Sequence, residues 1–109
     1  MKIQHIRGKH GNIIATLAAV KDEAKGVVNF GYAVVRDGDN PRKKVGTAIA
    51  QGRALKGGKL VVPSKIKEPF VEFLKHCQDR HEFDGFHLPV VEDFQFEEPF
   101  RVRKQQAQA

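Results

Sequence analysis

The sequence predicts an α+β fold: an antiparallel meander of three to four strands with two helices on one face and an extended C-terminal arm. The order of the patterns favours this class, because β-rich runs come first, two helical patterns follow, and a proline-containing aromatic segment comes last. The length of 109 residues fits one compact domain. We therefore expect a single domain over residues 1–103, with the arm at 86–103 and a flexible tail at 104–109.

The first third of the chain predicts the meander. Residues 1–7 alternate as a strand does, and residues 13–20 and 27–36 are β-rich runs joined by a polar connection that ends at Gly26. Alternate residues of the third run form one face that carries Phe30. We expect this face to pack against the helices.

A helix is predicted over residues 41–56. Asn40 can cap it, Pro41 suits the first helical position, and Gly57-Gly58 provides a left-handed stop. Small residues lie on two neighbouring faces, and we expect the pair Ala48 and Gly52 to allow close packing on the sheet. The apolar stripe comprises Val45, Ala48, Ile49, Gly52 and Leu55, and the basic face comprises Arg42, Lys43, Gly46, Ala50 and Arg53.

The second half of the chain predicts another helix and the arm. Residues 59–63 form a short strand or extended connection, and the helix begins near Glu68 and Pro69. Pro89 and Pro99 interrupt the segment that follows, which favours an edge strand or an extended arm over the domain. The apolar stripe of the second helix comprises Phe70, Phe73, Leu74, Cys77 and His81.

Charge is distributed unevenly along the chain. Residues 1–67 contain 14 Lys and Arg and four acids, whereas residues 68–98 contain nine acids and two cations. The net charge of +6 therefore averages a basic part and an acidic part. Either the folded protein has separate basic and acidic surfaces, or the two parts pair with each other within the fold.

Secreted, membrane and cofactor-dependent classes are not expected. Cys77 is the single cysteine, which excludes an intramolecular disulfide and a multi-cysteine zinc site. Residues 1–7 lack the apolar core of a secretory signal, and the longest apolar stretch, residues 13–20, is far shorter than the roughly 20 residues that span a bilayer. We expect a cytoplasmic protein without a membrane partner or cofactor.

Catalytic and metal-binding signatures are absent by inspection, so we expect no enzymatic activity. Residues 8–12 contain glycines and a lysine but lack the spacing of a phosphate-binding loop, and Ser64 has no base near it in the sequence. Cys77 and His81 lie four residues apart on one predicted helical face. Two ligands do not close a metal site, so we expect no metal and a buried Cys77.

The basic face of the first helix and the loop after it form the strongest candidate site. Cations at the start of a helix oppose the helix dipole, and each one lowers the stability of the helix by roughly a few tenths of a kcal/mol. An anion docked there would meet backbone N–H groups and cationic side chains together. The alternative is a solvated face that keeps the protein soluble. The predicted nucleic-acid contacts are Arg42, Lys43, Lys44, Arg53, Lys56 and Lys59.

The arm is the second candidate site. Five of the eight phenylalanines lie within residues 83–100, among acids. Rings that fold back would complete the core, whereas rings left exposed would form an apolar patch rimmed by charge, as protein-binding sites do. The predicted partner-binding residues are Phe94, Phe96 and Phe100.

A β-hairpin, an Asp-Asn turn and a basic helix follow one another in residues 31–55. The residues that define this pattern are Gly31-Tyr32-Ala33-Val34, Asp39-Asn40, Arg42-Lys43-Lys44-Val45-Gly46, Ala48-Ile49-Ala50 and Gly52-Arg53-Ala54-Leu55. The stretch resembles small phage-encoded proteins. The resemblance implies a viral origin, hence the host-cell cytoplasm, and favours a nucleic-acid accessory protein, a virion component or an inhibitor of a host enzyme or defence complex.

Two functional hypotheses follow. The leading one is a non-catalytic nucleic-acid-binding protein that contacts DNA or RNA phosphates through the basic helix and loop, with little base specificity. The other is a viral protein-binding module, either an inhibitor of a host protein or a virion assembly component, that uses the acidic, Phe-rich arm and forms homo-oligomers.

Overall fold

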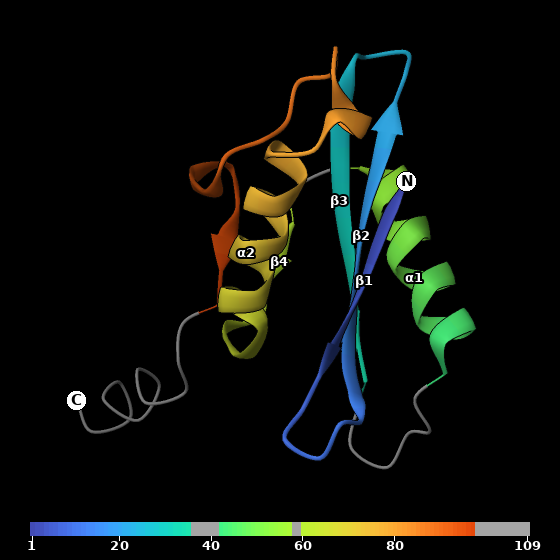
Figure 1. Ribbon diagram of the computed structural model, residues 1–109, viewed down its shortest axis with the longest axis vertical. Helices are drawn as coiled ribbons and strands as arrows, with labels where there is room; N and C mark the ends of the chain where they lie inside the picture. Colours follow the sequence, from blue (N-terminus) through green and yellow to red (C-terminus); the bar gives the residue numbers. More distant parts are fainter. Residues whose placement is uncertain (36–41, 58–59, 98–109) are drawn as a thin grey trace, which may run out of the picture.

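A three-stranded antiparallel sheet separates the two α-helices in the part of the chain that the structure describes (Figure 1). The computed structural model describes residues 1–35, 42–57 and 60–97. The strands are β1 (Lys2–Arg7), β2 (Ile13–Asp22) and β3 (Val27–Val34), in the spatial order β1-β2-β3. The predicted meander and the α+β class are confirmed.

The register of the sheet fixes which residues share a face. Thr16 of β2 lies between His5 of β1 and Ala33 of β3, and Ala18 lies opposite Gly31. Because side chains alternate along a strand, these small residues occupy one face, and Phe30 occupies the other. The central strand β2 is buried on both faces from Ala15 to Val20.

The face that carries Phe30 packs against α2 (Lys67–Gln78). Phe30 meets Phe73 edge to face, with ring centroids 5.8 Å apart, and Phe70 at 6.1 Å. The predicted stripe of α2 is confirmed except for His81, which lies beyond the helix end. The buried residues of α2 are Phe70, Phe73, Leu74 and Cys77.

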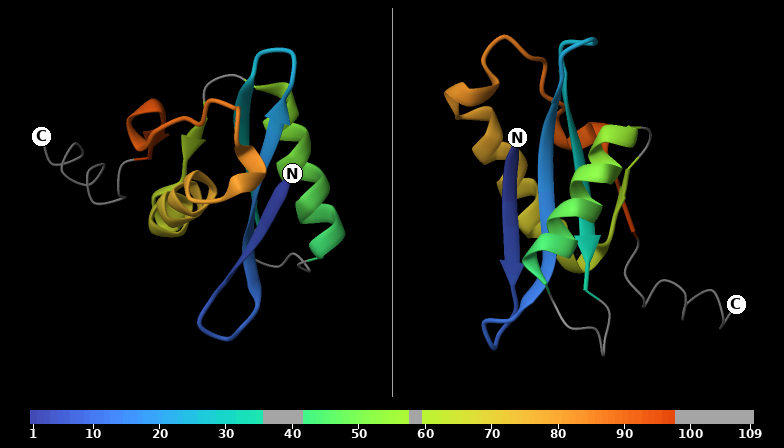
Figure 2. Two further views of the ribbon diagram at one scale, coloured as in Figure 1. Left: turned by 45° about the horizontal axis from the view of Figure 1, so that its top comes forward. Right: turned by 90° about the vertical axis from the view of Figure 1, so that its right-hand side faces the viewer.

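The other face of the sheet packs against α1 (Lys43–Lys56), so the prediction that both helices share one face is wrong. Figure 1 and the right-hand view of Figure 2 both show α1 and α2 on opposite sides of the sheet. This second core is small and consists of Ala18, Ala33 and Ala50, with Ile3 packed at its edge. The residues of β2 and β3 that face α1 have small side chains. Because such side chains fill little space, α1 packs close to the sheet.

The orientation of α1 also differs from the prediction. Ala50 and Ala54 are buried, and a Cβ at Gly46 would lie 2.7 Å from Thr16 Oγ1, so these three residues face the sheet. Val45 and Ile49 of the predicted core stripe are exposed, as are Ala48 and Gly52. The close packing therefore uses the small residues of the face predicted to be basic. The predicted stop is confirmed at Gly57, whose φ is +72°.

Residues 86–97 form an arm over the α2 side of the sheet. After a single parallel bridge between His87 and Val27, the arm continues to β5 (Gln95–Phe96), which pairs in parallel with β4 (Val61–Val62). Single turns of 3-10 helix lie at Ser64–Ile66, His81–Phe83 and Val91–Asp93. The predicted cap at Asn40 and Pro41, the loop residue Lys59 and the tail 104–109 lie outside the described residues.

Candidate nucleic-acid interface

The cations of α1 occupy both ends of a helix that contains no acidic residue. Arg42, Lys43 and Lys44 lie at its start, Arg53 and Lys56 at its end, and all five are exposed. Gly46, Ala50 and Ala54 place the sheet on one side of α1, so the cations flank the helix or point to solvent. Lys59, the sixth predicted contact, lies outside the described residues.

The start of α1 lies beside the end of β1 in a positively charged environment. His5 on β1 shares a hydrogen bond of 2.9 Å with Thr16 Oγ1. Its pKa is lowered from 6.5, first by burial and then by the positive charges of Lys43 and Arg7. The guanidinium of Arg7 donates a hydrogen bond of 2.7 Å to the Gly11 carbonyl. The β1–β2 hairpin therefore adds positive charge to the N-terminal end of α1.

Arg53 has a structural role in addition to its charge. Its guanidinium donates a hydrogen bond of 2.9 Å to the carbonyl of Tyr32 and lies 5.8 Å from the centre of the Tyr32 ring. The Tyr32 hydroxyl donates in turn to the Val61 carbonyl at 2.7 Å, and burial raises the pKa of this phenol. Arg53 therefore attaches the end of α1 to the edge of β3, which the sequence did not predict.

Acidic side chains gather on the opposite side of the sheet. The described acids after residue 67 belong to α2 and to the segments that follow it, which lie on the α2 side in Figure 1. Within the described ranges, neither Arg42 nor any of the four cations of α1 forms an ion pair. Arg42 and the cations of α1 thus lie across the sheet from α2, although other cations of the basic part, Lys65 and Lys67, lie on the α2 side.

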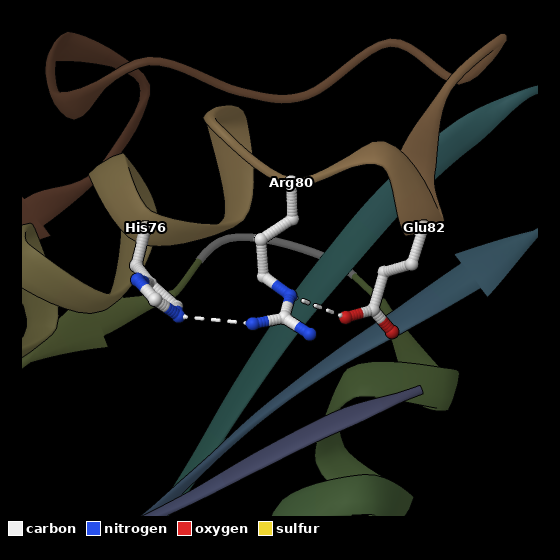
Figure 3. A network of polar contacts seen from close by, with 3 residues as sticks. All are labelled: His76, Arg80 and Glu82. Atoms are coloured by element: carbon white, nitrogen blue, oxygen red, sulfur yellow. Dashed lines mark hydrogen bonds and ion pairs between the residues drawn. The ribbon is translucent and has the colours of Figure 1, made fainter.

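Cations on the acidic side are partly paired, as Figure 3 shows for Arg80. Its Nε donates a hydrogen bond of 3.0 Å to Glu82 Oε1, and its Nη1 lies 3.4 Å from His76 Nε2. His81, beyond α2, contacts Asp84 at 3.1 Å. These local contacts at the end of α2 contrast with the unpaired cations of α1.

The predicted partner-binding rings of the arm pack into the core. The Phe94 ring lies edge to face against Phe70, with centroids 5.0 Å apart, and against Phe30 at 6.0 Å. Phe96 lies 6.3 Å from Phe70. Both rings are half-buried against the α2 face, because the β4–β5 pair holds the arm there. Phe100 lies outside the described residues.

Cys77 and His81, which lie four residues apart in the sequence, do not form a shared site. Cys77 is fully buried, and burial raises the pKa of its thiol to about 11, whereas the His81 side chain is 97% exposed. The described ranges contain no cluster of three or more His, Cys, Asp or Glu that could hold a metal ion.

A pocket of about 330 Å³ lies beside the edge of β3, between Phe30, Gly57 and His87.

Comparison of the chain with protein-family models, curated proteins and solved structures finds no match. In the part of the chain that the structure describes, no helix has the length and apolar character required to cross a membrane. The surface of α1, which carries cations and no acid, is the strongest candidate site in the described residues.

The surface of α1 also carries an apolar stripe that the sequence does not predict to be exposed. Val45, Ile49 and Leu55 of this stripe are exposed among the cations. The signal that identifies the true inner face is the four-residue spacing of Gly46, Ala50 and Ala54, together with the small residues Gly31 and Ala33 on β3.

Proposed function

We propose that the protein binds nucleic acid through the phosphate backbone, using the exposed cations of α1. The observation that carries this proposal is that α1 and its N-cap residue Arg42 hold five cations and no acid, and that they lie on the side of the sheet opposite α2 and the acid-rich segments that follow α2. Such a one-sided distribution provides a positive surface on which phosphates displace counterions. The predicted contacts are Arg42, Lys43, Lys44, Arg53, Lys56 and Lys59.

The start of α1 supports the proposal energetically. Its first turn contains no acidic side chain, and no side chain caps it. Cations in that position destabilise the helix by roughly a few tenths of a kcal/mol each, whereas a phosphate would accept from the free backbone N–H groups and offset the repulsion. Arg42, Lys43 and Lys44 thus oppose the helix dipole in the free protein and favour an anion in the bound state.

Binding through this surface carries little sequence preference. The outer face of α1 presents mainly aliphatic and cationic side chains, which do not supply the paired donors and acceptors that distinguish one base pair from another. We expect affinity to depend on salt far more than on sequence.

The experiment is a fluorescence-anisotropy titration of labelled duplex DNA, single-stranded DNA and RNA over a series of salt concentrations. Each phosphate contact contributes a slope of about −0.9 in log affinity against log salt on duplex DNA. The variant Lys43→Ala/Lys44→Ala should flatten the slope by about two such contacts. The control Lys65→Ala/Lys75→Ala removes two exposed lysines from the α2 side and should leave the slope unchanged. No binding at low salt would refute the proposal.

A further inference from the structure

The outer face of α1 carries an apolar stripe that the sheet does not use. Val45, Ile49 and Leu55 are 52%, 43% and 62% exposed, and they are half of the large apolar side chains exposed in the described residues. Ala48 and Gly52, also exposed, lie between them on the same face. The spacing of three, four and seven residues is that of a helix with a seam for another element.

Phosphate binding accounts for the cations of α1 and leaves this stripe unexplained. Aliphatic side chains pressed against base edges would remove water from base donors and acceptors and offer no hydrogen bond in return, which costs free energy. Packing on the sheet does not require the stripe either, because Gly46, Ala50 and Ala54 already provide that contact. An exposed apolar stripe therefore points to a partner that brings its own apolar side chains.

The charges beside the stripe define the rest of the partner. At 100° per residue, Lys44 lies on one side of the stripe and Arg42 on the other, whereas Lys56 lies in line with the stripe at the end of α1. A partner that covers the stripe thus meets cations at both rims. Such a partner binds most tightly if the residues that flank its own apolar stripe are acidic, since opposite charges at the border of an interface favour association.

The same charges disfavour the binding of a second copy of the protein, or of its own C-terminal residues, to the outer face of α1. In a symmetric pair of α1 helices that cross at Ile49, Arg42 of each copy would lie beside Lys56 of the other, so like charges would meet. The C-terminal residues 98–109 contain three cations and one acid and do not complement α1.

From these observations we infer that the outer face of α1 is a docking site for an acidic amphipathic helix of another protein. Large apolar side chains of that helix pack around Val45, Ile49 and Leu55, and the small residues Ala48 and Gly52 allow one of those side chains to approach the backbone of α1 closely. Its acidic flanks pair with Lys44 and Arg42, and an acidic residue at its end pairs with Lys56. Such a partner covers the surface assigned above to phosphates, so the two ligands compete.

The test uses the full chain and three labelled helical peptides of equal length. The first carries a leucine stripe at heptad spacing with glutamate on both flanks. The second has the same stripe with lysine flanks, and the third has the glutamate flanks with serine in place of leucine. We expect the first peptide to bind at least about tenfold more tightly than either of the others. The proposal is overturned if the first peptide does not bind or if the lysine-flanked peptide binds equally well.

Variants of the protein complete the test. Val45→Ser/Ile49→Ser should weaken the first peptide by at least about tenfold, whereas the control Val61→Ser/Val90→Ser, at two exposed valines outside α1, should leave its affinity within about twofold. Both variants alter exposed residues, and their thermal melts should match the parent. Retained peptide affinity in Val45→Ser/Ile49→Ser overturns the proposal.

Two other occupants are distinguished by the same variant. An equal loss of duplex DNA affinity in Val45→Ser/Ile49→Ser would assign the stripe to the nucleic-acid interface. A dimer of the parent chain in sedimentation analysis that dissociates in this variant would assign the stripe to a second copy. Either result overturns the docking of an acidic helix. Unchanged DNA binding together with lost peptide binding supports it.

Discussion

Gly31 of β3 lies directly against the backbone of Ala54 in α1. A Cβ at Gly31 would approach the Ala54 nitrogen to 2.6 Å, closer than side chains and backbone pack, and would also overlap the Ala50 carbonyl oxygen. The sheet and α1 therefore meet through their backbones at this point. Glycine is required here for close approach, since its φ is not in the left-handed region.

Substitution of Gly31 should consequently separate α1 from the sheet. We expect Gly31→Ala to lower the free energy of unfolding by about 3 kcal/mol, because backbone atoms of α1 cannot move aside as a flexible side chain does. Gly52→Ala is the matched control: Gly52 is an exposed helical residue with no atom within 4 Å of an added Cβ, so alanine should raise stability by about 0.5–1 kcal/mol. Urea denaturation measures both values. Equal stability of the two variants would contradict the close approach.

The arm should contribute to stability through Phe94. Removal of a ring in edge-to-face contact with Phe30 and Phe70 loses apolar burial and leaves a cavity, and we expect Phe94→Ala to cost about 3 kcal/mol. Val90→Ala, at an exposed position on the same arm, should change stability by less than about 0.5 kcal/mol. Thermal melts compare the two variants, and a mild effect of Phe94→Ala would show that the arm is not part of the core.

His5 should make the protein less stable in mild acid. The folded state holds the pKa of His5 below 6.5, so the unfolded chain binds a proton more readily than the folded chain does. The free energy of unfolding therefore falls as the pH decreases from 6.5 toward the lowered value. His5→Gln should reduce this pH dependence, whereas His10→Gln, in the exposed β1–β2 turn, should retain it. If the free energy of unfolding changed with pH equally in His5→Gln and in the parent, the pH dependence would not come from His5.

Cys77 should be unreactive in the folded protein. Its side chain is fully buried, and its pKa is raised to about 11, so very little thiolate is present near neutral pH. We expect a thiol reagent such as DTNB to react slowly with the native chain and completely with the urea-unfolded chain. Rapid reaction of the native chain would show that the thiol is not enclosed in the core between α2 and the sheet.

The meander and the aromatic face of α2 could be predicted from the sequence because their signals are local. Alternation defines β1 and β3, and Phe70, Phe73 and Cys77 recur at helical spacing with large apolar side chains. The length and boundaries of these elements agree with the structure to within a few residues.

The face of α1 that packs against the sheet could not be predicted in this way. Hydrophobic periodicity favours the larger residues Val45 and Ile49 as the inner face. The structure buries Ala50 and Ala54 instead, because Gly31 on the opposing strand admits only a small contact. Such a choice depends on the match between two elements, and neither element reveals it alone. Five of the six predicted cations are exposed in the described residues, whereas their position across the sheet from α2 follows from the placement of α1, which the sequence does not predict.

The alanine core beneath α1 affects how easily this helix opens locally. Ala18, Ala33 and Ala50 bury little apolar area compared with the phenylalanines beneath α2, so less free energy is needed to lift α1 than to open the other layer. Native-state hydrogen exchange should therefore show the amides of α1 exchanging through local opening, while those of β2 and α2 exchange only when the whole domain unfolds. The helix that presents the candidate binding surface is then the element most free to adjust its position when a ligand arrives.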